Sequence, residues 1–303
     1  MHASQAPFLL TSERYSVTDI ALAPLPDLMI EPIVRAALLE DLGRAGDVTT
    51  DAVVPVDARL AVVAATRKAG VVAGLSVAAL AFRLVDPTLA VEMRAKDGDV
   101  LAPGDAVLAV SGRARSILTA ERVALNFLCR LSGIATATAG LVAAAKGHGH
   151  ARVTCTRKTT PGLRALEKYA VRAGGGSSHR YGLDDAILIK DNHIAAAGGI
   201  RPALLAARAH AGHLVRIEVE VDTLDQLREA LEIGFDAVLL DNMGPAMLRE
   251  AVALVAGRAV TEASGGITLE AVPAIAAAGV DVISAGWLTH SAPILDFGLD
   301  AVG

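Results

Sequence analysis

The chain has 303 residues, of which 53% are hydrophobic and 3% aromatic, so it is long enough for one large domain or two modest ones. Its formal net charge of -5 argues against broad attraction to nucleic acid or to an anionic membrane. Two cysteines are too few for a disulfide scaffold or a zinc site, which favours a cytoplasmic protein, and the sequence lacks the uninterrupted apolar run of a membrane span.

The first elements along the chain predict a small α/β domain. Residues 1–27 lack the apolar core of a secretory signal, and we interpret them as an N-terminal extension. An amphipathic helix is predicted over Leu28–Glu40, followed by capping and turn residues at Asp47–Thr50. Short apolar runs between turns then predict the strands Leu60–Ala65, Val91–Arg94 and Ala106–Val110.

The turns of this region also resemble those of a lipoyl or biotinyl carrier over Asp97–Gly112. A carrier needs a lysine at the tip of the hairpin, and Pro103 and Gly104 stand there instead. We therefore favour a small sheet packed on helices. A long helix predicted over Ser116–Leu131 marks the domain boundary, which we place after residue 131.

After residue 147 the pattern changes to apolar strands that alternate with helices. The predicted strands are Ala151–Cys155, Ala186–Ile189, Val215–Val221, Ala237–Leu240, Arg258–Glu262 and Asp281–Ser284. The predicted helices are Leu163–Arg172, Arg201–Ala211, Leu224–Ile233, Ala246–Ala256 and Leu269–Ala278. This alternation indicates a parallel sheet with right-handed crossovers. The number of units favours a barrel, with a doubly wound open sheet as the alternative.

Polar or glycine-rich segments lie at the carboxyl ends of all of these predicted strands. They are Thr156–Thr159, Lys190–His193, Glu218–Asp222, Asp241–Asn242, Glu262–Gly266 and Ala285–Gly286. Reacting groups of parallel barrels gather at the carboxyl ends of the strands. We therefore expect these segments to form one site.

Basic residues dominate between the first two strand ends. Those at strand ends or in the intervening loop are Arg157, Lys158, Arg180 and Lys190. Arginine forks match paired carboxylate oxygens, so these residues predict a small ligand with several negative charges. Three more recur every four residues on a predicted helix, and we interpret them as a solvated face: Arg164, Lys168 and Arg172.

Acidic residues mark the third and fourth strand ends. Glu218 and Glu220 are two apart on a strand and so share a face with Arg216. With Asp241 on the next strand, they could hold Mg²⁺, ribose hydroxyls or both. The alternative is an internal ion-pair network with Arg216 and the nearby lysines.

The later strand ends suggest a phosphate site. Ser264, Gly265 and Gly266 lie in a strand-to-helix turn, where glycine lets backbone N–H groups approach a phosphate. Gly286 follows the next strand, and a plain tight turn is the alternative for the glycine pair.

The histidines and the remaining motifs narrow the chemistry. His179, beside Arg180, could donate to an anionic ligand, and His193 could cap a helix. The sequence lacks a Ser-His-Asp order and a GxGxxG after the first strand of the barrel, so acyl and hydride transfer are unsupported.

Three linked motifs resemble the quinolinate phosphoribosyltransferases: Thr156–Arg164, Gly174–Arg180 and Ile187–His193. Further segments that carry the resemblance are Glu121–Asn126, Glu218–Val221, Leu240–Met243 and Ser284–Ser291. The similarity covers about residues 28 to 300. One departure is Ser178, which stands where the family has asparagine.

The resemblance implies an N-terminal α/β sandwich domain, residues 28–131, and an incomplete parallel α/β barrel, residues 132–303, whose last segment packs back on the first domain. It implies transfer of phosphoribosyl from phosphoribosyl pyrophosphate to quinolinate, with release of pyrophosphate and carbon dioxide. It also implies Mg²⁺ as cofactor and at least a homodimer, with no nucleic acid or membrane partner.

The family's site residues carry over by position. The catalytic residues implied are Lys158, Lys190, Glu220 and Asp241, of which Glu220 and Asp241 would hold Mg²⁺ and the ribose. The quinolinate pocket would be lined by Arg157, Lys158, His179, Arg180 and Lys190. The 5-phosphate would be cradled by Ser264, Gly265, Gly266, Ala285 and Gly286. Arg122 would reach the site of a neighbouring subunit.

Two other functions remain open at this point. A relative of the same fold from molybdate operons would use another acceptor, and the intact Lys190–His193 motif argues against it. A phosphate-ligand binding protein that has lost catalysis is disfavoured by the intact Lys158, Glu220 and Asp241.

Overall fold

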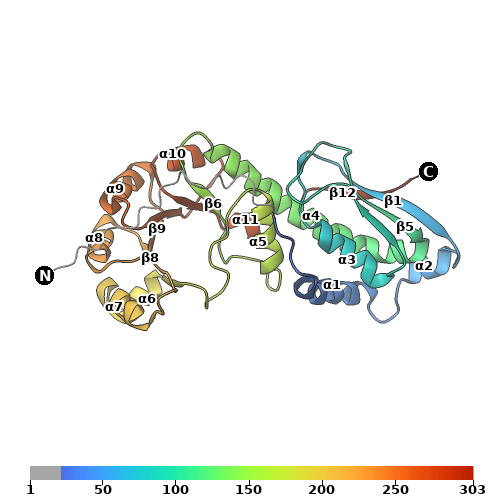
Figure 1. Cartoon of the computed structure of the whole chain (residues 1–303), viewed down its shortest axis with the longest axis horizontal. Helices are drawn as coiled ribbons and strands as arrows, with labels where there is room; N and C mark the ends of the chain where they lie inside the picture. Colours follow the sequence, from blue (N-terminus) through green and yellow to red (C-terminus); the bar gives the residue numbers. More distant parts are fainter. Residues whose placement is uncertain (1–21, 303) are drawn as a thin grey trace.

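The computed structural model of the protein describes residues 22–302. Figure 1 shows two lobes, connected by the long helix α4 (Ala114–Ala145), which runs from one lobe into the other. The predicted boundary after residue 131 therefore falls inside a helix rather than in a linker. Most of the predicted extension, residues 1–27, lies outside the described part of the chain.

The first lobe packs helices on a small antiparallel sheet, as predicted. Its elements are α1 (Asp27–Leu42), α2 (Val48–Val53), β1 (Arg59–Thr66), β2 (Gly70–Val71), α3 (Leu75–Val85), β3 (Ala90–Met93), β4 (Val100–Leu101), β5 (Ala106–Arg113) and β12 (Phe297–Ala301). The strand order in the main sheet is β12-β1-β5-β3. Helix α3 is almost wholly apolar, and its burial against α4 places the core of the lobe between the helices and the sheet.

The last strand of the chain belongs to this first lobe. β12 pairs antiparallel with β1, with Val62 opposite Ala301 and Thr66 opposite Phe297. The chain thus crosses between the lobes twice, once through α4 and once after α11 (Trp287–His290).

The second lobe is a parallel sheet wrapped by helices. Its strands are β6 (Arg152–Thr154), β7 (Ile187–Ile189), β8 (Ile217–Val221), β9 (Ala237–Asp241), β10 (Val260–Ser264) and β11 (Val282–Ser284). The other helices are α5 (Arg164–Ala173), α6 (Asp191–Ala197), α7 (Ile200–His210), α8 (Leu224–Ile233), α9 (Pro245–Val255) and α10 (Val272–Ala276).

The strand order β6-β11-β10-β9-β8-β7 identifies an incomplete barrel. Neighbours in space are neighbours in sequence all the way from β7 to β11, and β6 then pairs with β11. A doubly wound sheet would reverse direction midway along this order. The barrel stays open between β6 and β7, where an isolated bridge joins Thr154 to Ser177.

Local sequence explains why β8 presents its acids to the interior of the barrel. Ile217, Val219 and Val221 are buried among the apolar residues of the lobe, and the alternate positions Glu218 and Glu220 are only partly buried. Side chains alternate between the faces of a strand, so both acids face the same side, as predicted.

Helix α4 is also long and apolar enough to cross a membrane by length and composition alone. Its apolar residues are buried against α3, α5 and the sheet of the first lobe, among them Leu128, Leu131 and Ile134. This is the position of a core helix.

Candidate active site

A cavity of about 410 Å³ opens at the carboxyl ends of the barrel strands. It is lined by Thr156, Arg157, Lys158, His179, Arg180, Leu188, Lys190, Glu220, Leu239, Asp241, Glu262, Ser264 and Ser284. The loop after β6, the loop before β7 and the ends of β7 to β11 all contribute to it. The strand-end segments therefore meet in one place, as the order of motifs predicts.

Most of the predicted site residues line this cavity. Those that do are Arg157, Lys158, His179, Arg180, Lys190, Glu220, Asp241 and Ser264. Gly265, Gly266, Ala285 and Gly286 follow β10 and β11 beside it. Arg122 is exposed on α4 and is not among the lining residues.

The cationic side of the cavity holds two guanidinium groups that are short of partners. Within residues 22–302, Nε of Arg157 and Nε of Arg180 are buried and donate no hydrogen bond to the protein. Burial and the positive charge of Arg157 both lower the pKa of Arg180. Two like charges held together in a cavity with free donors favour an anion between them.

The acidic side lies on the neighbouring strands β8 and β9. Nζ of Lys190 donates to Oε2 of Glu220 at 2.8 Å, and Oδ2 of Asp241 accepts from the side chain of Asn242. The alternative of an internal ion-pair network is confirmed for the lysines by this Lys190–Glu220 pair and is wrong for Arg216, which lies at the amino end of β8. Its exposed guanidinium pairs there with Asp236 at 2.8 Å.

His179 is held by the protein through both ring nitrogens. Its Nε2 lies 3.0 Å from Oε2 of Glu218 and 3.6 Å from Oε1 of Glu262. Its Nδ1 accepts the backbone N–H of Arg180 at 2.8 Å. Burial lowers the pKa of His179, but the hydrogen bond to Glu218 and the charges of the two carboxyls outweigh it and raise the pKa overall. A direct contact of His179 with an anionic ligand stays a prediction.

The solvated-face interpretation is wrong for Lys168. This side chain is fully buried, and its Nζ donates to the backbone oxygen of His179 at 2.9 Å and lies 3.5 Å from Sγ of Cys155. The ammonium also lies 5.0 Å from the centre of the Tyr181 ring. Burial lowers the pKa of Lys168. The lysine thus fixes the His179 loop instead of meeting solvent.

Two smaller predictions have clear outcomes. His193 caps a helix, as predicted, because its Nδ1 accepts the N–H of Lys190 at 2.9 Å in the first turn of α6. The predicted helix after Gly265 and Gly266 is shorter than expected and begins only at Val272. Gly265 has a φ of 88°, and a β-carbon there would collide with Asn242.

Gly286 packs closely against the residues of the site. A β-carbon at this position would lie 3.0 Å from Cδ of Lys158 and 3.4 Å from Oγ1 of Thr156. Glycine therefore leaves room for the Lys158 side chain beyond the end of β11.

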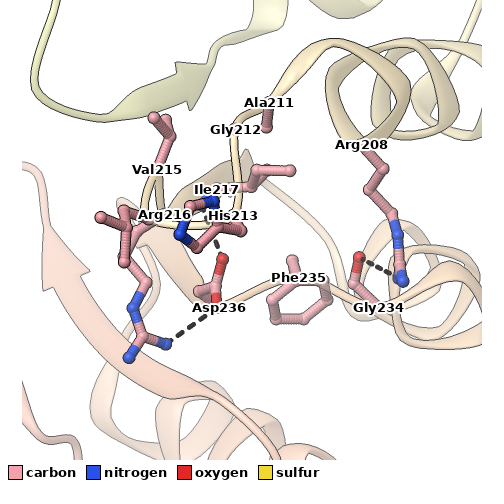
Figure 2. A pocket seen from close by; sticks show the side chains of 11 residues that line it. Arg208, Ala211, Gly212, His213, Val215, Arg216, Ile217, Gly234, Phe235 and Asp236 are labelled. Carbon is pink, nitrogen blue, oxygen red and sulfur yellow. Dashed lines mark hydrogen bonds and ion pairs between the residues drawn. The ribbon is translucent and has the colours of Figure 1, made fainter.

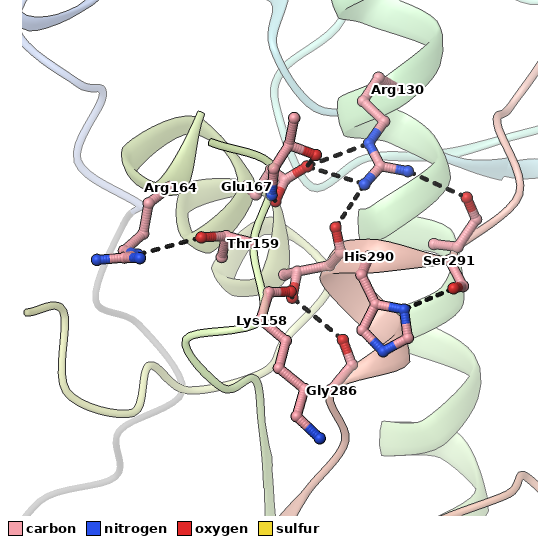
Figure 3. A network of polar contacts seen from close by, with 11 residues as sticks. Arg130, Lys158, Thr159, Arg164, Glu167, Gly286, His290 and Ser291 are labelled. Carbon is pink, nitrogen blue, oxygen red and sulfur yellow. Dashed lines mark hydrogen bonds and ion pairs between the residues drawn. The ribbon is translucent and has the colours of Figure 1, made fainter. Parts of the chain in front are cut away.

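A buried ion pair fixes the loop that carries Arg157 and Lys158. Figure 3 shows Arg130 of α4 reaching Glu167 of α5, with Nη2 and Oε1 2.8 Å apart. Glu167 is fully buried and also accepts from N–H and hydroxyl of Thr160 at 3.0 and 2.8 Å. Thr289 donates its hydroxyl to the backbone oxygen of Lys158 at 2.8 Å.

Replacing Glu167 by alanine is expected to lower the free energy of unfolding by about 3 kcal/mol, because the largely buried guanidinium of Arg130 loses its carboxylate. The exposed pair Arg35–Glu31 is the matched control, and Arg35→Ala should change it by less than about 0.5 kcal/mol. Urea unfolding of both variants makes the comparison. Equal losses would show that the Glu167 pair does not stabilise the fold.

A second cavity, of about 650 Å³, lies at the opposite end of the barrel (Figure 2). Its lining comes from the segments before β8 and β9, including Arg208, Arg216 and Asp236. Arg216 pairs with Asp236, and Arg208 donates to backbone oxygens of Ile233 and Gly234. Because its charges are paired and it lies at the amino ends of the strands, we place the chemistry in the smaller cavity.

Sequence reasoning missed part of the lining. The missed residues are Leu188, Leu239 and Ser284, whereas Thr156 and Glu262 lie in predicted strand-end segments but were given no individual role. Glu262 carried a usable signal for such a role, because it lies two positions before Ser264 on the same strand and so shares its face.

An α/β barrel with a cationic pocket beside a pair of acids defines a class of enzymes that act on small anionic substrates. Family models agree with this in detail. The quinolinate phosphoribosyl transferase N-terminal domain matches residues 47–132, and its C-terminal domain matches residues 134–300. The chain belongs to the quinolinate phosphoribosyl transferase family.

Several relatives are similar over nearly their whole length. A probable nicotinate-nucleotide pyrophosphorylase (carboxylating) of Bacillus subtilis (strain 168) is 45% identical, over 90% of this chain and 93% of its own. The enzyme of that name from Mycobacterium leprae (strain TN) is 46% identical, over 88% and 95%. The crystal structure of NadC from Streptococcus pyogenes has a TM-score of 0.87 at 43% identity, covering 93% of this chain and 100% of that one.

Proposed function

We propose that the protein transfers the phosphoribosyl group of phosphoribosyl pyrophosphate to quinolinate, releasing pyrophosphate and carbon dioxide and forming nicotinate mononucleotide for NAD biosynthesis. The observation that supports this most directly is the pair of buried guanidiniums, Arg157 and Arg180, whose Nε donors lack partners within the described residues. A pyridine dicarboxylate supplies the paired oxygens that such forks bind. The family named above performs this reaction, as the names of its decarboxylating members state.

The two sides of the cavity suit the two halves of the reaction. The dicarboxylate is held by Arg157 and Arg180, which orient the ring nitrogen toward the anomeric carbon of the ribose. As pyrophosphate leaves, negative charge grows on it and positive charge on the sugar. Lys158 and Lys190 stabilise the departing anion, and the carboxylates of Glu220 and Asp241 hold the ribose.

The acidic pair also fits Mg²⁺. Two carboxylates are a typical protein contribution to a magnesium site, since this ion keeps several waters and takes other ligands from substrate phosphates. Glu220 and Asp241 lie on adjacent parallel strands and both line the cavity. When bound, the ion would neutralise charge on the pyrophosphate.

Loss of carbon dioxide follows from the alkylated ring. The ring nitrogen is then cationic. It stabilises the electron pair that is left on the adjacent ring carbon when the carboxylate on that carbon departs as carbon dioxide. Groups that pair strongly with the departing carboxylate would oppose its loss. We therefore expect the basic pocket as a whole to clamp the other carboxylate more tightly than the departing one.

We also propose a cytoplasmic homodimer, or a larger homo-oligomer, with shared sites. Arg122 is exposed on α4 in the first lobe, whereas the cavity lies in the second. An arginine in that place suits the site of a partner subunit better than its own.

The direct test is product detection. Purified protein with quinolinate, phosphoribosyl pyrophosphate and Mg²⁺ should release nicotinate mononucleotide and carbon dioxide in equal amounts. Omission of the phosphoribosyl donor is the control. Absence of product under these conditions would refute the proposed function.

Quinolinate should be preferred strongly over nicotinate. Nicotinate has one carboxylate and leaves a buried cation of the Arg157–Arg180 pair without its partner, which costs about 2–5 kcal/mol. We expect kcat/KM to fall by about 30-fold or more. Steady-state kinetics with each acid at saturating donor measure this ratio. Equal values for the two acids would contradict the role given to the arginines.

A further inference from the structure

Glu262 is the most buried acid of the cavity and takes no part in the mechanism above. It lies on β10, its residue is 5% exposed, and it lines the cavity. Within residues 22–302, its Oε1 is buried and has no hydrogen-bond partner. A buried polar atom without a partner at the wall of a binding cavity needs an explanation.

The hydrogen bonds of His179 decide the protonation of this cluster. Because Nδ1 accepts the N–H of Arg180, the ring proton must sit on Nε2. Nε2 lies closer to Glu218, at 3.0 Å, than to Glu262, at 3.6 Å. The Nε2 proton is therefore directed to Glu218, and Oε1 of Glu262 receives no hydrogen bond from the ring.

Oε1 of Glu262 is left without a hydrogen bond among the described residues. Its surroundings contribute Glu218 from β8, His179 from the loop before β7 and Lys168 from α5, while Ser284 lines the same wall from β11. Burial and the negative charge of Glu218 raise the pKa of Glu262 to about 7, although His179, the Ser284 hydroxyl and Lys168 lower it. The carboxyl is therefore neutral below about pH 7.

The same three groups have ligand atoms within 4.8 Å of one another, a spacing that suits a divalent cation. A metal on Nε2 would place the ring proton on Nδ1, against the N–H of Arg180. The tautomer that the backbone imposes therefore disfavours a metal here, and the O–H of Glu262 remains the free donor.

We propose that Glu262 is a further substrate-binding residue, whose protonated carboxyl donates a hydrogen bond to a carboxylate of the dicarboxylate substrate. This rests on the proposed function. The carboxylate lies between the cationic forks of Arg157 and Arg180 and the neutral carboxyl of Glu262. Binding of the anion favours the neutral form of Glu262 further, so binding takes up a proton wherever Glu262 is ionised in the free protein.

The affinity for the dicarboxylate should depend on pH through the ionisation of Glu262. Below about pH 7 Glu262 already carries its proton, and affinity for the dicarboxylate is fully present. Above that pH the free carboxyl is ionised and must be protonated on binding, so affinity falls by up to about tenfold for each pH unit. Glutamine at this position keeps a donor and cannot ionise, so it removes the dependence.

The experiment is isothermal titration of the full chain with quinolinate, at pH 6 and pH 8, in two buffers of different ionisation enthalpy. The wild-type protein should take up close to one more proton per site at pH 8 than at pH 6. Glu262→Gln should lack this extra uptake, and its affinity relative to wild type should rise by about tenfold between the two pH values. Glu220→Gln, a carboxylate on the other side of the cavity, should retain the uptake.

Equal proton uptake by wild type and Glu262→Gln at pH 8 would overturn the proposal, as would a wild-type protein with no change in uptake between the two pH values. The wild-type measurement stands even if the variant does not fold. The KM for quinolinate at saturating donor, followed over the same pH range, gives the second readout. Failure of the proposed function is distinct, because wild-type protein would then form no nicotinate mononucleotide at either pH.

Discussion

Glu220→Gln and Asp241→Asn should each lower kcat by about a hundredfold and leave the affinity for quinolinate nearly unchanged. Loss of one transition-state contact typically costs about 3 kcal/mol. Both carboxylates lie on the acidic side of the cavity, where we place the metal-bound donor, and not between Arg157 and Arg180. The loss should therefore appear in turnover and in the dependence on donor and Mg²⁺.

Calorimetric titration with quinolinate alone, beside steady-state kinetics in donor and Mg²⁺, separates the two effects. Quinolinate binding should stay the same or tighten slightly, because a nearby negative charge has been removed. Release of Lys190 from its 2.8 Å contact with Glu220 acts in the same direction. If quinolinate affinity collapsed while donor kinetics stayed at wild-type values, our division of the cavity by charge would be wrong.

Arg122→Ala and Lys190→Ala should each be nearly inactive alone and should complement each other when mixed. If Arg122 serves the partner's cavity, a mixed dimer contains one site with both substitutions and one site with neither. Random exchange in an equimolar mixture then gives about a quarter of wild-type activity. Lys190 lines the cavity of its own chain, so the two substitutions affect opposite sites.

The measurement needs subunit exchange to be verified, for example by mass spectrometry of differently tagged chains. The mixture of Lys190→Ala with Glu220→Gln is the matched control, since both residues belong to one cavity. Those mixed dimers contain no intact site. Recovery in that control, or none in the first mixture after verified exchange, would exclude the shared site.

The parts of the site that could be predicted are those with a strict period. Alternation along β8 places Glu218 and Glu220 on one face, and the strand-helix alternation puts Lys190 and Asp241 at the same end of a barrel. Both inferences need only backbone geometry. The family resemblance added the open barrel and the roles of individual residues.

The errors arise where tertiary packing overrides local pattern. The spacing of Lys168 is that of an exposed helical stripe, and only the position of the His179 loop shows that its ammonium is buried and bonded. Arg216 appeared to share the face of Glu218, but strand β8 begins at residue 217 and Arg216 lies outside the barrel. Arg130 and Glu167 pair across two helices and are 37 positions apart in the chain, so no local pattern indicates their contact.

The position of β12 has a consequence for synthesis of the protein on the ribosome. Thr66 and Asp296, which contact each other beside the β1–β12 pair, are 230 positions apart. At roughly 5–20 residues per second, the nascent first lobe waits about ten seconds or longer for its last strand. Until then β1 has an open edge, which can template pairing with other chains. A message cut short before residue 297 would therefore yield an aggregation-prone product, however complete its barrel.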